Sequence, residues 1–269
     1  MTMPHSADLT DFDATGGEMT RSMAQNGWYF HKAYDGPFDR FQVLGERGCG
    51  TNLLRKSITK THRIMRTEAL GWKHAVPMMI AVPPSFLTVC IVREARGWAT
   101  SLYNRPWHSD PSLQQVKFPE FLRTPWIGSI EFADQFEIYH PELDPEGFEL
   151  QWDRHPLTGR RYANLFEMRN VKHQGLLSLP ARGGSVAYVT LERFNADPRA
   201  FLDAMGEIYG LLPTERGYRP VTRRMGNQWR SAYQRDPAPA DWPTADVAWM
   251  NSQIDPRIEA VFGYVSPEA

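Results

Sequence analysis

The stretch that most constrains the fold of this chain is a glycine-rich turn between an apolar segment and a helical one. Gly45, Gly48 and Gly50 lie between the apolar residues 39–45 and the helical pattern of residues 51–60. Glycine adopts the backbone conformations that turn several N–H groups toward one point. A helix that begins directly after the turn adds the positive end of its dipole there. The stretch therefore predicts a strand, an anion-binding turn and a helix.

This turn differs from the nucleoside-triphosphate loop G-x-x-x-x-G-K-[ST], in which Lys reaches the phosphates and Ser or Thr holds Mg²⁺. Gly45 and Gly50 have the right spacing, but Thr51 takes the Lys position and Asn52 takes the hydroxyl position. An amide is a poor ligand for Mg²⁺, so we expect an anion site that uses no metal. Arg47 is the nearest cation, and its guanidinium is suited to bidentate contact with a phosphate or sulfate.

Further segments predict strands that alternate with helices. Residues 86–92 form a continuous apolar run, which is typical of a buried parallel strand. The other expected elements are helices at 95–103 and 164–179, a strand at 185–190, and a helix beginning at Asp197-Pro198. This order predicts an α/β fold, a parallel β-sheet flanked by helices. The carboxyl ends of the first two strands then bring the turn and Arg93 to one edge.

The rest of the chain is expected to decorate one domain, residues 39–269. Residues 1–38 are polar with little periodicity and predict an irregular N-terminal arm. Residues 106–160 are rich in Pro, Trp and acidic side chains, which indicates irregular insertions of loops and short helices over the site. Residues 245–262 predict a helix, and so a helical C-terminal extension.

Composition limits the partners and the compartment. The net charge of −1 gives no general attraction to nucleic acid or to a membrane surface. No stretch approaches the roughly 20 apolar residues of a membrane span, and no secretory signal pattern opens the chain. Cys49 and Cys90 are the only cysteines, too few for a disulfide framework or a cysteine zinc site. We expect a cytoplasmic protein, with Cys90 in the core and Cys49 serving as a small residue.

Together these segments resemble the sulfotransferases that use 3′-phosphoadenosine-5′-phosphosulfate (PAPS), in a bacterial-type form with a P-loop-type sheet. Their donor loop, [KR]-S-G-T-[TN], is similar to Arg47-Gly48-Cys49-Gly50-Thr51-Asn52, with one extra residue and with Cys in place of Ser. Their 3′-phosphate element is a strand that ends in Arg, with a Ser eight residues later, and it is similar to Arg93 and Ser101. The resemblance implies that these residues bind the donor.

A third element of the resemblance is Lys73-His74, which lies between the other two. It implies that His74 is the catalytic base and that Lys73, with Arg47, stabilises the donor's leaving group. A carboxylate acts as the base in some family members, so Glu68 is an alternative, and His108 is a third candidate. The family's late basic segment, which closes over the 3′-phosphate, corresponds to a stretch that includes Arg224 and Gly226.

The implied reaction moves a sulfuryl group from PAPS to a hydroxyl or amine of a small-molecule or carbohydrate acceptor, without a metal. A P-loop kinase is the main alternative, and it predicts a Lys-[ST] pair where this chain has Thr51-Asn52. An inactive nucleotide-binding or scaffold protein of the same fold is the second alternative. Arg169 and Lys172 share a helical spacing that suits an anionic acceptor, but we favour a solvated helix face for them.

Overall fold

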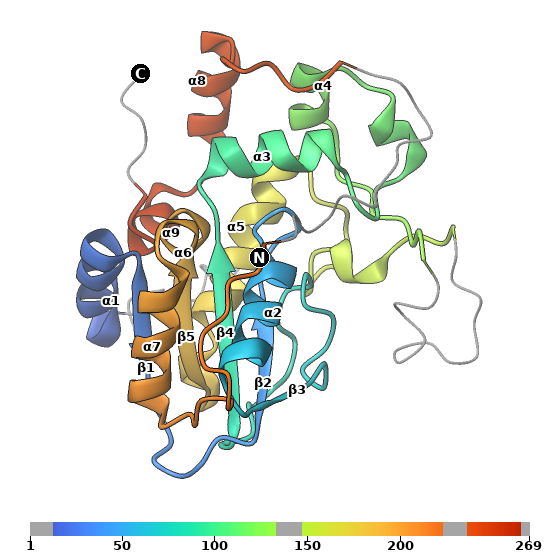
Figure 1. Ribbon diagram of the computed structural model, residues 1–269. Coiled ribbons are helices and arrows are strands. Elements are labelled where there is room, and N and C mark those ends of the chain that lie inside the picture. Colours follow the sequence, from blue (N-terminus) through green and yellow to red (C-terminus); the bar gives the residue numbers. More distant parts are fainter. Residues whose placement is uncertain (1–12, 133–146, 223–235, 265–269) are drawn as a thin grey trace.

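The computed structural model describes residues 13–132, 147–222 and 236–264 (Figure 1). These residues form an α/β structure around a five-stranded mixed sheet with the strand order β1-β5-β4-β2-β3. Helices lie on both faces of the sheet and beyond the carboxyl ends of its parallel strands.

Four strands of the sheet are parallel, and three of them are strands that the sequence predicts. They are β2 (Arg40–Leu44), β3 (Met65–Arg66), β4 (Phe86–Val92) and β5 (Ser185–Thr190). β4 lies at the centre, between β2 and β5, and every β5 residue is buried. The predicted strands at 39–45, 86–92 and 185–190 are confirmed.

Side chains of the strands alternate between two hydrophobic cores, one on each face of the sheet. Val43 and Val89 belong to the first core, whereas Leu44 and Cys90 belong to the second. Successive residues of a strand point to opposite faces, so a strand covered on both sides must be apolar throughout. This double burial explains the uninterrupted apolar run of residues 86–92.

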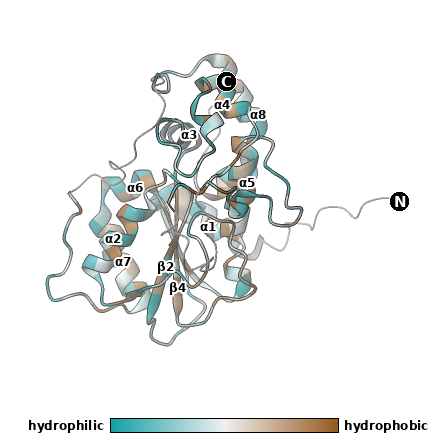
Figure 2. Cartoon of the chain, turned by 90° about the vertical axis from the view of Figure 1, so that its right-hand side faces the viewer, coloured by the Kyte–Doolittle hydropathy of each residue, from teal (hydrophilic) through white to brown (hydrophobic). Residues whose placement is uncertain are grey.

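The helices divide between the two faces (Figure 2). α2 (Thr51–Thr61), α6 (Leu191–Ala196) and α7 (Pro198–Tyr209) cover one face. α1 (Asp13–Asn26) and α5 (Leu165–Leu177) lie on the other. The predicted helices at 51–60, 164–179 and from Pro198 are confirmed, with ends that shift by one or two residues.

α3 (Ala95–Asn104) crosses the carboxyl ends of the strands, with α4 (Phe118–Arg123) and α8 (Thr244–Gln253) beyond it (Figure 1). The carboxylate of Glu94 accepts hydrogen bonds from the backbone N–H groups of Arg96 and Gly97. That N-cap satisfies two N–H groups that the first turn of α3 leaves without helical partners. It places the start of α3 directly after β4.

The N-terminal segment differs from the irregular arm that its sequence pattern predicts. Residues 13–31 form α1 and β1 (Trp28–His31), and β1 pairs antiparallel with β5, with Trp28 opposite Val189. Met19, Met23 and Tyr29 are buried in the second core. The sheet is therefore mixed, not wholly parallel, because its edge is completed from the N-terminal side of the chain.

The C-terminal extension is helical as predicted, but it is two helices where one was expected. α8 ends at Gln253, and α9 spans Pro256–Val261. Proline disfavours helical backbone at the residue before it, which accounts for the break at Asp255. The Asp255 carboxylate then caps α9 by accepting from the Arg257 N–H.

The region predicted to hold loops and short helices does so in its described part. It contains α4 and two short 3₁₀ helices, Pro111–Gln114 and Gln151–Asp153. Across the described ranges, no helix is both long enough and apolar enough to cross a membrane.

Candidate functional site

The glycine-rich turn lies where the sheet's connections diverge. β2 is flanked by β3 on one side and by β4 on the other. In open α/β sheets, such a divergence leaves a crevice at the carboxyl ends of the strands, where ligands bind. The loop 45–50 joins β2 to α2 at this edge, and Arg93 follows β4 at the same edge.

Within the described residues, no side chain caps the N-terminus of α2, which the loop leads into. Gly48 and Gly50 adopt left-handed backbone angles, with φ of 80° and 86°. Gly50 is the N-cap residue of α2, and no side chain caps that helix, in contrast to α3 with Glu94. The free N–H groups of this first turn and the helix dipole favour an anion.

Gly45 ties the loop to two neighbouring segments. Its N–H donates to the Lys73 carbonyl oxygen at 3.0 Å, and its own carbonyl accepts from Nδ1 of His74 at 2.6 Å. A Cβ atom at this position would lie 2.3 Å from the Ile91 carbonyl oxygen in β4. The close approach of three backbone segments therefore requires glycine here.

We expect Gly45→Ala to lower the free energy of unfolding by at least about 2 kcal/mol, because the loop or β4 must shift and φ is 153°. Gly71→Ala is the matched control. Gly71 has a φ of 96° but no atom within 4 Å of an added Cβ, so it isolates the backbone strain, about 1 kcal/mol. Urea denaturation of both variants measures the difference. Equal losses in the two would contradict the close-approach argument.

Arg93, Ser101 and Gly48 lie together, although the sequence separates them widely. Nη1 of Arg93 donates to the Gly48 carbonyl oxygen at 3.0 Å. A Cβ atom on Gly48 would lie 3.2 Å from Oγ of Ser101. A guanidinium and a hydroxyl thus lie directly against the glycine-rich loop that leads into α2.

His74 lies beneath the loop as a neutral imidazole. It is 8% exposed, and a carbonyl can only accept, so Nδ1 carries the hydrogen that bonds to Gly45. Burial, and then the charge of Lys73, hold the pKa of His74 well below its usual value. Nε2 is therefore the ring nitrogen with a lone pair available for a proton.

Lys73 and Glu68 lie near the start of α2. Burial, and then the charge of Arg55, lower the pKa of Lys73 to about 8. The Glu68 carboxylate lies 3.0 Å from Nη1 of Arg55 and 3.8 Å from Nε of Arg66. These ion pairs hold the Glu68 carboxylate against two guanidinium groups, which makes it a weaker candidate base than His74.

His108, like His74, packs against Trp72. The Trp72 ring meets the ring of His74 edge-on at 5.2 Å and that of His108 at 6.0 Å. Nδ1 of His108 accepts a hydrogen bond from the Glu131 N–H at 3.2 Å. His108 is thus held among aromatic side chains and shares Trp72 with His74.

Arg47 points into the protein, away from any ligand at the loop mouth. Its guanidinium lies between the rings of Trp72 and Trp126, 5.4 Å and 4.9 Å from their centroids. Nη2 is 2.7 Å from an Asp153 oxygen, and both side chains are 1% exposed. The bidentate phosphate contact expected of Arg47 is therefore not available in this structure, because a buried carboxylate holds it.

Arg47 belongs to a buried ion cluster that we define as Glu46, Arg47, Asp153 and Lys172. Nζ of Lys172 lies 2.7 Å from Asp153 and 3.8 Å from Glu46. Burial raises the pKa of Asp153, but Arg47 and Lys172 lower it by more. Burial raises the pKa of Glu46, which Lys172 and Arg47 only partly oppose.

The solvated helix face that we favour for Arg169 and Lys172 is wrong. Both side chains are buried in α5, and Arg169 makes a two-armed ion pair with Glu259 at 2.7 and 2.8 Å. Arg169 also donates to the Arg93 carbonyl oxygen at 2.9 Å. Arg169 therefore connects α9 to the segment that follows β4.

Three of the remaining residues predicted to bind the donor are described by the structure, and two lie outside the described ranges. Thr51 begins α2 and is buried, and Oδ1 of Asn52 has no hydrogen-bond partner within the described part of the chain. Cys49 is fully buried, and burial raises the pKa of its thiol, which suits a small packing residue. Arg224 and Gly226 lie outside the described residues.

Sequence reasoning missed Asp153, which holds two cations and also accepts from Nε1 of Trp126 at 3.0 Å. It lies 106 positions after Arg47, in a segment without periodicity, so no local pattern points to it. In the described ranges, no three His, Cys, Asp or Glu side chains gather as a metal would require.

Comparisons with models of protein families, with curated proteins and with solved structures found no match to this chain.

Proposed function

We propose that this protein is a sulfotransferase that moves a sulfuryl group from PAPS to a hydroxyl or amine of a small-molecule or carbohydrate acceptor. The observation that carries the proposal is the convergence of Gly48, Arg93 and Ser101 beside an uncapped helix N-terminus. A donor with phosphate groups on both its 3′ and 5′ positions needs two anion sites close together. The α2 N-terminus suits the 5′ group, and Arg93 with Ser101 suits the 3′ group.

The proposed reaction needs charge stabilisation and one proton transfer. The acceptor oxygen or nitrogen bonds to sulfur while the bond from sulfur to the 5′-phosphate oxygen breaks. The leaving adenosine 3′,5′-bisphosphate gains negative charge, which the α2 N–H groups and Lys73 would stabilise. Arg47 does not contact the leaving group directly, since Asp153 holds its guanidinium in the interior.

His74 is the residue that we assign to the proton transfer. The acceptor proton would pass to Nε2, since Nδ1 is committed to the Gly45 carbonyl. The hydrogen bond to Gly45 fixes the tautomer and also links the base to the donor loop. A neutral imidazole is the form that a general base requires.

Nucleotide binding tests the proposal against the kinase alternative. Adenosine 3′,5′-bisphosphate should raise the melting temperature without added metal and by more than ATP with Mg²⁺ does. A screen of ³⁵S-labelled PAPS against pooled hydroxylated metabolites and glycans then tests turnover. A larger shift with ATP and Mg²⁺ would favour a kinase, and donor binding without any transfer would favour the inactive protein.

We expect Arg93→Ala to weaken adenosine 3′,5′-bisphosphate binding at least tenfold more than it weakens 5′-AMP binding. The guanidinium should contact the 3′-phosphate, which 5′-AMP lacks, and a charge-assisted hydrogen bond contributes about 1.5–3 kcal/mol. Isothermal titration calorimetry measures both affinities. Arg105→Ala, at the other end of α3, is the matched control and should leave both unchanged. Equal losses for the two nucleotides in Arg93→Ala would exclude a 3′-phosphate site at this residue.

A further inference from the structure

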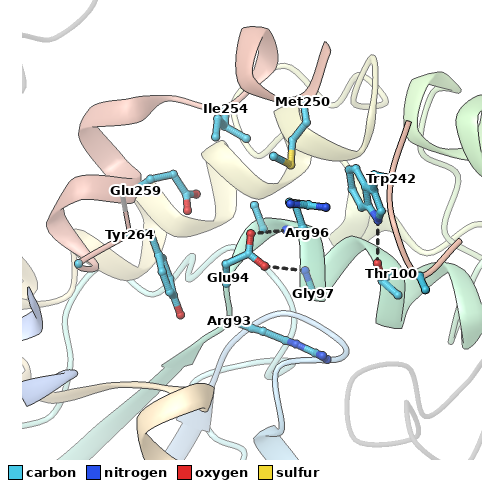
Figure 3. Close-up of a pocket in the computed structure, with 13 residues that line it drawn as sticks. Arg93, Glu94, Arg96, Gly97, Thr100, Trp242, Met250, Ile254, Glu259 and Tyr264 are labelled. Atoms are coloured by element: carbon cyan, nitrogen blue, oxygen red, sulfur yellow. Dashed lines mark hydrogen bonds between the residues drawn. The ribbon is translucent and has the colours of Figure 1, made fainter. Parts of the chain in front are cut away.

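A cavity of about 600 Å³ lies beyond α3, on the side that faces α8 and α9 (Figure 3). Its walls come from the first turns of α3, from Trp242, from Met250 and Ile254, and from Tyr264. A volume of 300–1,000 Å³ with apolar and aromatic walls and a few polar groups is typical of small-molecule sites. Of the donor-site residues assigned above, Arg93 lines this cavity, whereas Ser101, His74 and the α2 N-terminus do not.

Arg96 is the charged group of the cavity that remains available to a ligand. Glu94 is committed to the N-cap of α3, and Glu259 is committed to Arg169. Arg93 lines the cavity, but its guanidinium contacts the Gly48 carbonyl, where we assign it to the donor's 3′-phosphate. Within the described residues, Arg96 makes no ion pair, and its guanidinium lies over the Trp242 ring at 5.8 Å from the centroid (Figure 3).

The aromatic wall is held in a fixed position. Nε1 of Trp242 donates to Oγ1 of Thr100 at 3.1 Å, and the Trp242 ring meets the Phe118 ring edge-on at 4.8 Å. On the other side of the cavity, the hydroxyl of Tyr264 donates to Glu192 at 2.8 Å. Figure 3 shows Met250 and Ile254 above Arg96, between these two aromatic walls. A rigid apolar slot with one stacked guanidinium suits a flat ring that carries a negative group.

We propose that this cavity binds a small planar aromatic anion, with the ring against the apolar wall and the sulfonate, carboxylate or phosphate group on Arg96. The cavity shares Arg93 with the proposed donor site, but the contact proposed here is made by Arg96. Thr100 faces the cavity, whereas its neighbour Ser101 lies against Gly48. The proposal therefore does not depend on the function of the glycine-rich loop.

Naphthalene-2-sulfonate is a suitable probe, with naphthalene-2-sulfonamide as its neutral counterpart. By isothermal titration calorimetry, the sulfonate should bind the full chain at one site with a Kd below about 1 mM. Arg96→Gln should weaken the sulfonate at least tenfold, as expected for loss of a charge-assisted contact. The sulfonamide should bind at least tenfold more weakly than the sulfonate, and Arg96→Gln should not change its affinity.

Arg193→Gln is the matched control. Arg193 also lies over a tryptophan, 4.9 Å from the centroid of Trp28, but it does not line the cavity, so the sulfonate should bind this variant within twofold of wild type. Saturating adenosine 3′,5′-bisphosphate should not displace the sulfonate. Unchanged affinity in Arg96→Gln, equal loss in Arg193→Gln, or full displacement by the bisphosphate would each overturn the proposal. Failure of the bisphosphate to bind at all would count against the proposed sulfotransferase and not against this site.

Discussion

His74→Ala should reduce sulfuryl transfer by roughly 10²–10⁴-fold while leaving adenosine 3′,5′-bisphosphate affinity within about threefold of wild type. The loss follows from removal of the neutral imidazole whose Nε2 is free to accept the acceptor's proton. Donor affinity should persist, because the hydrogen bond from His74 to the loop goes to the Gly45 carbonyl and not to a group assigned to the donor. Single-turnover transfer from ³⁵S-labelled PAPS and calorimetric titration measure the two quantities separately.

The pH profile provides a second readout of the same base. Burial and the Lys73 charge lower the pKa of His74 well below its usual value, so the base form persists as the pH falls. Transfer by the wild type should therefore not fall as the pH drops from 8 to 6.5, and it should decline only at lower pH. His31→Ala, on the edge strand β1, is the control and should leave the rate unchanged. If the large loss appears instead in Glu68→Gln or His108→Ala, the base is that residue and not His74.

Asp153→Asn is expected to lower the free energy of unfolding by about 3–5 kcal/mol, the usual cost of breaking a buried ion pair. Its carboxylate accepts from Lys172 and lies 2.7 Å from the Arg47 guanidinium, and it is 1% exposed. Asparagine keeps the size but places a neutral amide against two cations that water cannot reach. Folded domains are stable by only about 5–15 kcal/mol, so this is a large fraction of the total.

Urea denaturation at pH 7 measures this loss against two comparison variants. Asp203→Asn removes an exposed aspartate that pairs with Arg199 on α7 and should cost less than about 1 kcal/mol. Lys172→Met leaves Asp153 paired with Arg47 and Trp126, so it should cost less than Asp153→Asn. An Asp153→Asn variant as stable as the Asp203→Asn variant would mean that the buried ion cluster does not stabilise the folded protein.

Most of the elements that surround the candidate site could be predicted, because their signals are local. The apolar run 86–92, the turn glycines and the proline after Asp197 each determine the backbone of the few residues around them. Arg93 and Ser101 were singled out by the resemblance to the sulfotransferases, and the structure brings both against Gly48. Local periodicity is enough here because buried parallel strands and capped helices carry distinctive patterns.

The structure of the N-terminal segment could not be predicted from its local sequence pattern. Residues 13–31 carry a weak pattern, with Gly16 and Gly17 inside α1, yet they form a helix and an edge strand. β1 acquires its backbone partners from β5, more than 150 residues away, through pairs such as Trp28 with Val189. Long-range strand pairing and burial against the second core override weak local preference.

The sequence by itself determined a glycine-rich turn between a buried strand and a helix, because glycine spacing and apolar periodicity act over neighbouring residues. Only the tertiary structure decided which cation faces that turn. Arg47 sits inside the turn in sequence, but Asp153 and two tryptophans from distant segments draw its guanidinium into the interior. Arg93, from the next strand of the sheet, contacts the loop instead. A long charged side chain takes its direction from partners that folding brings to it, and those partners lie beyond the reach of any local pattern.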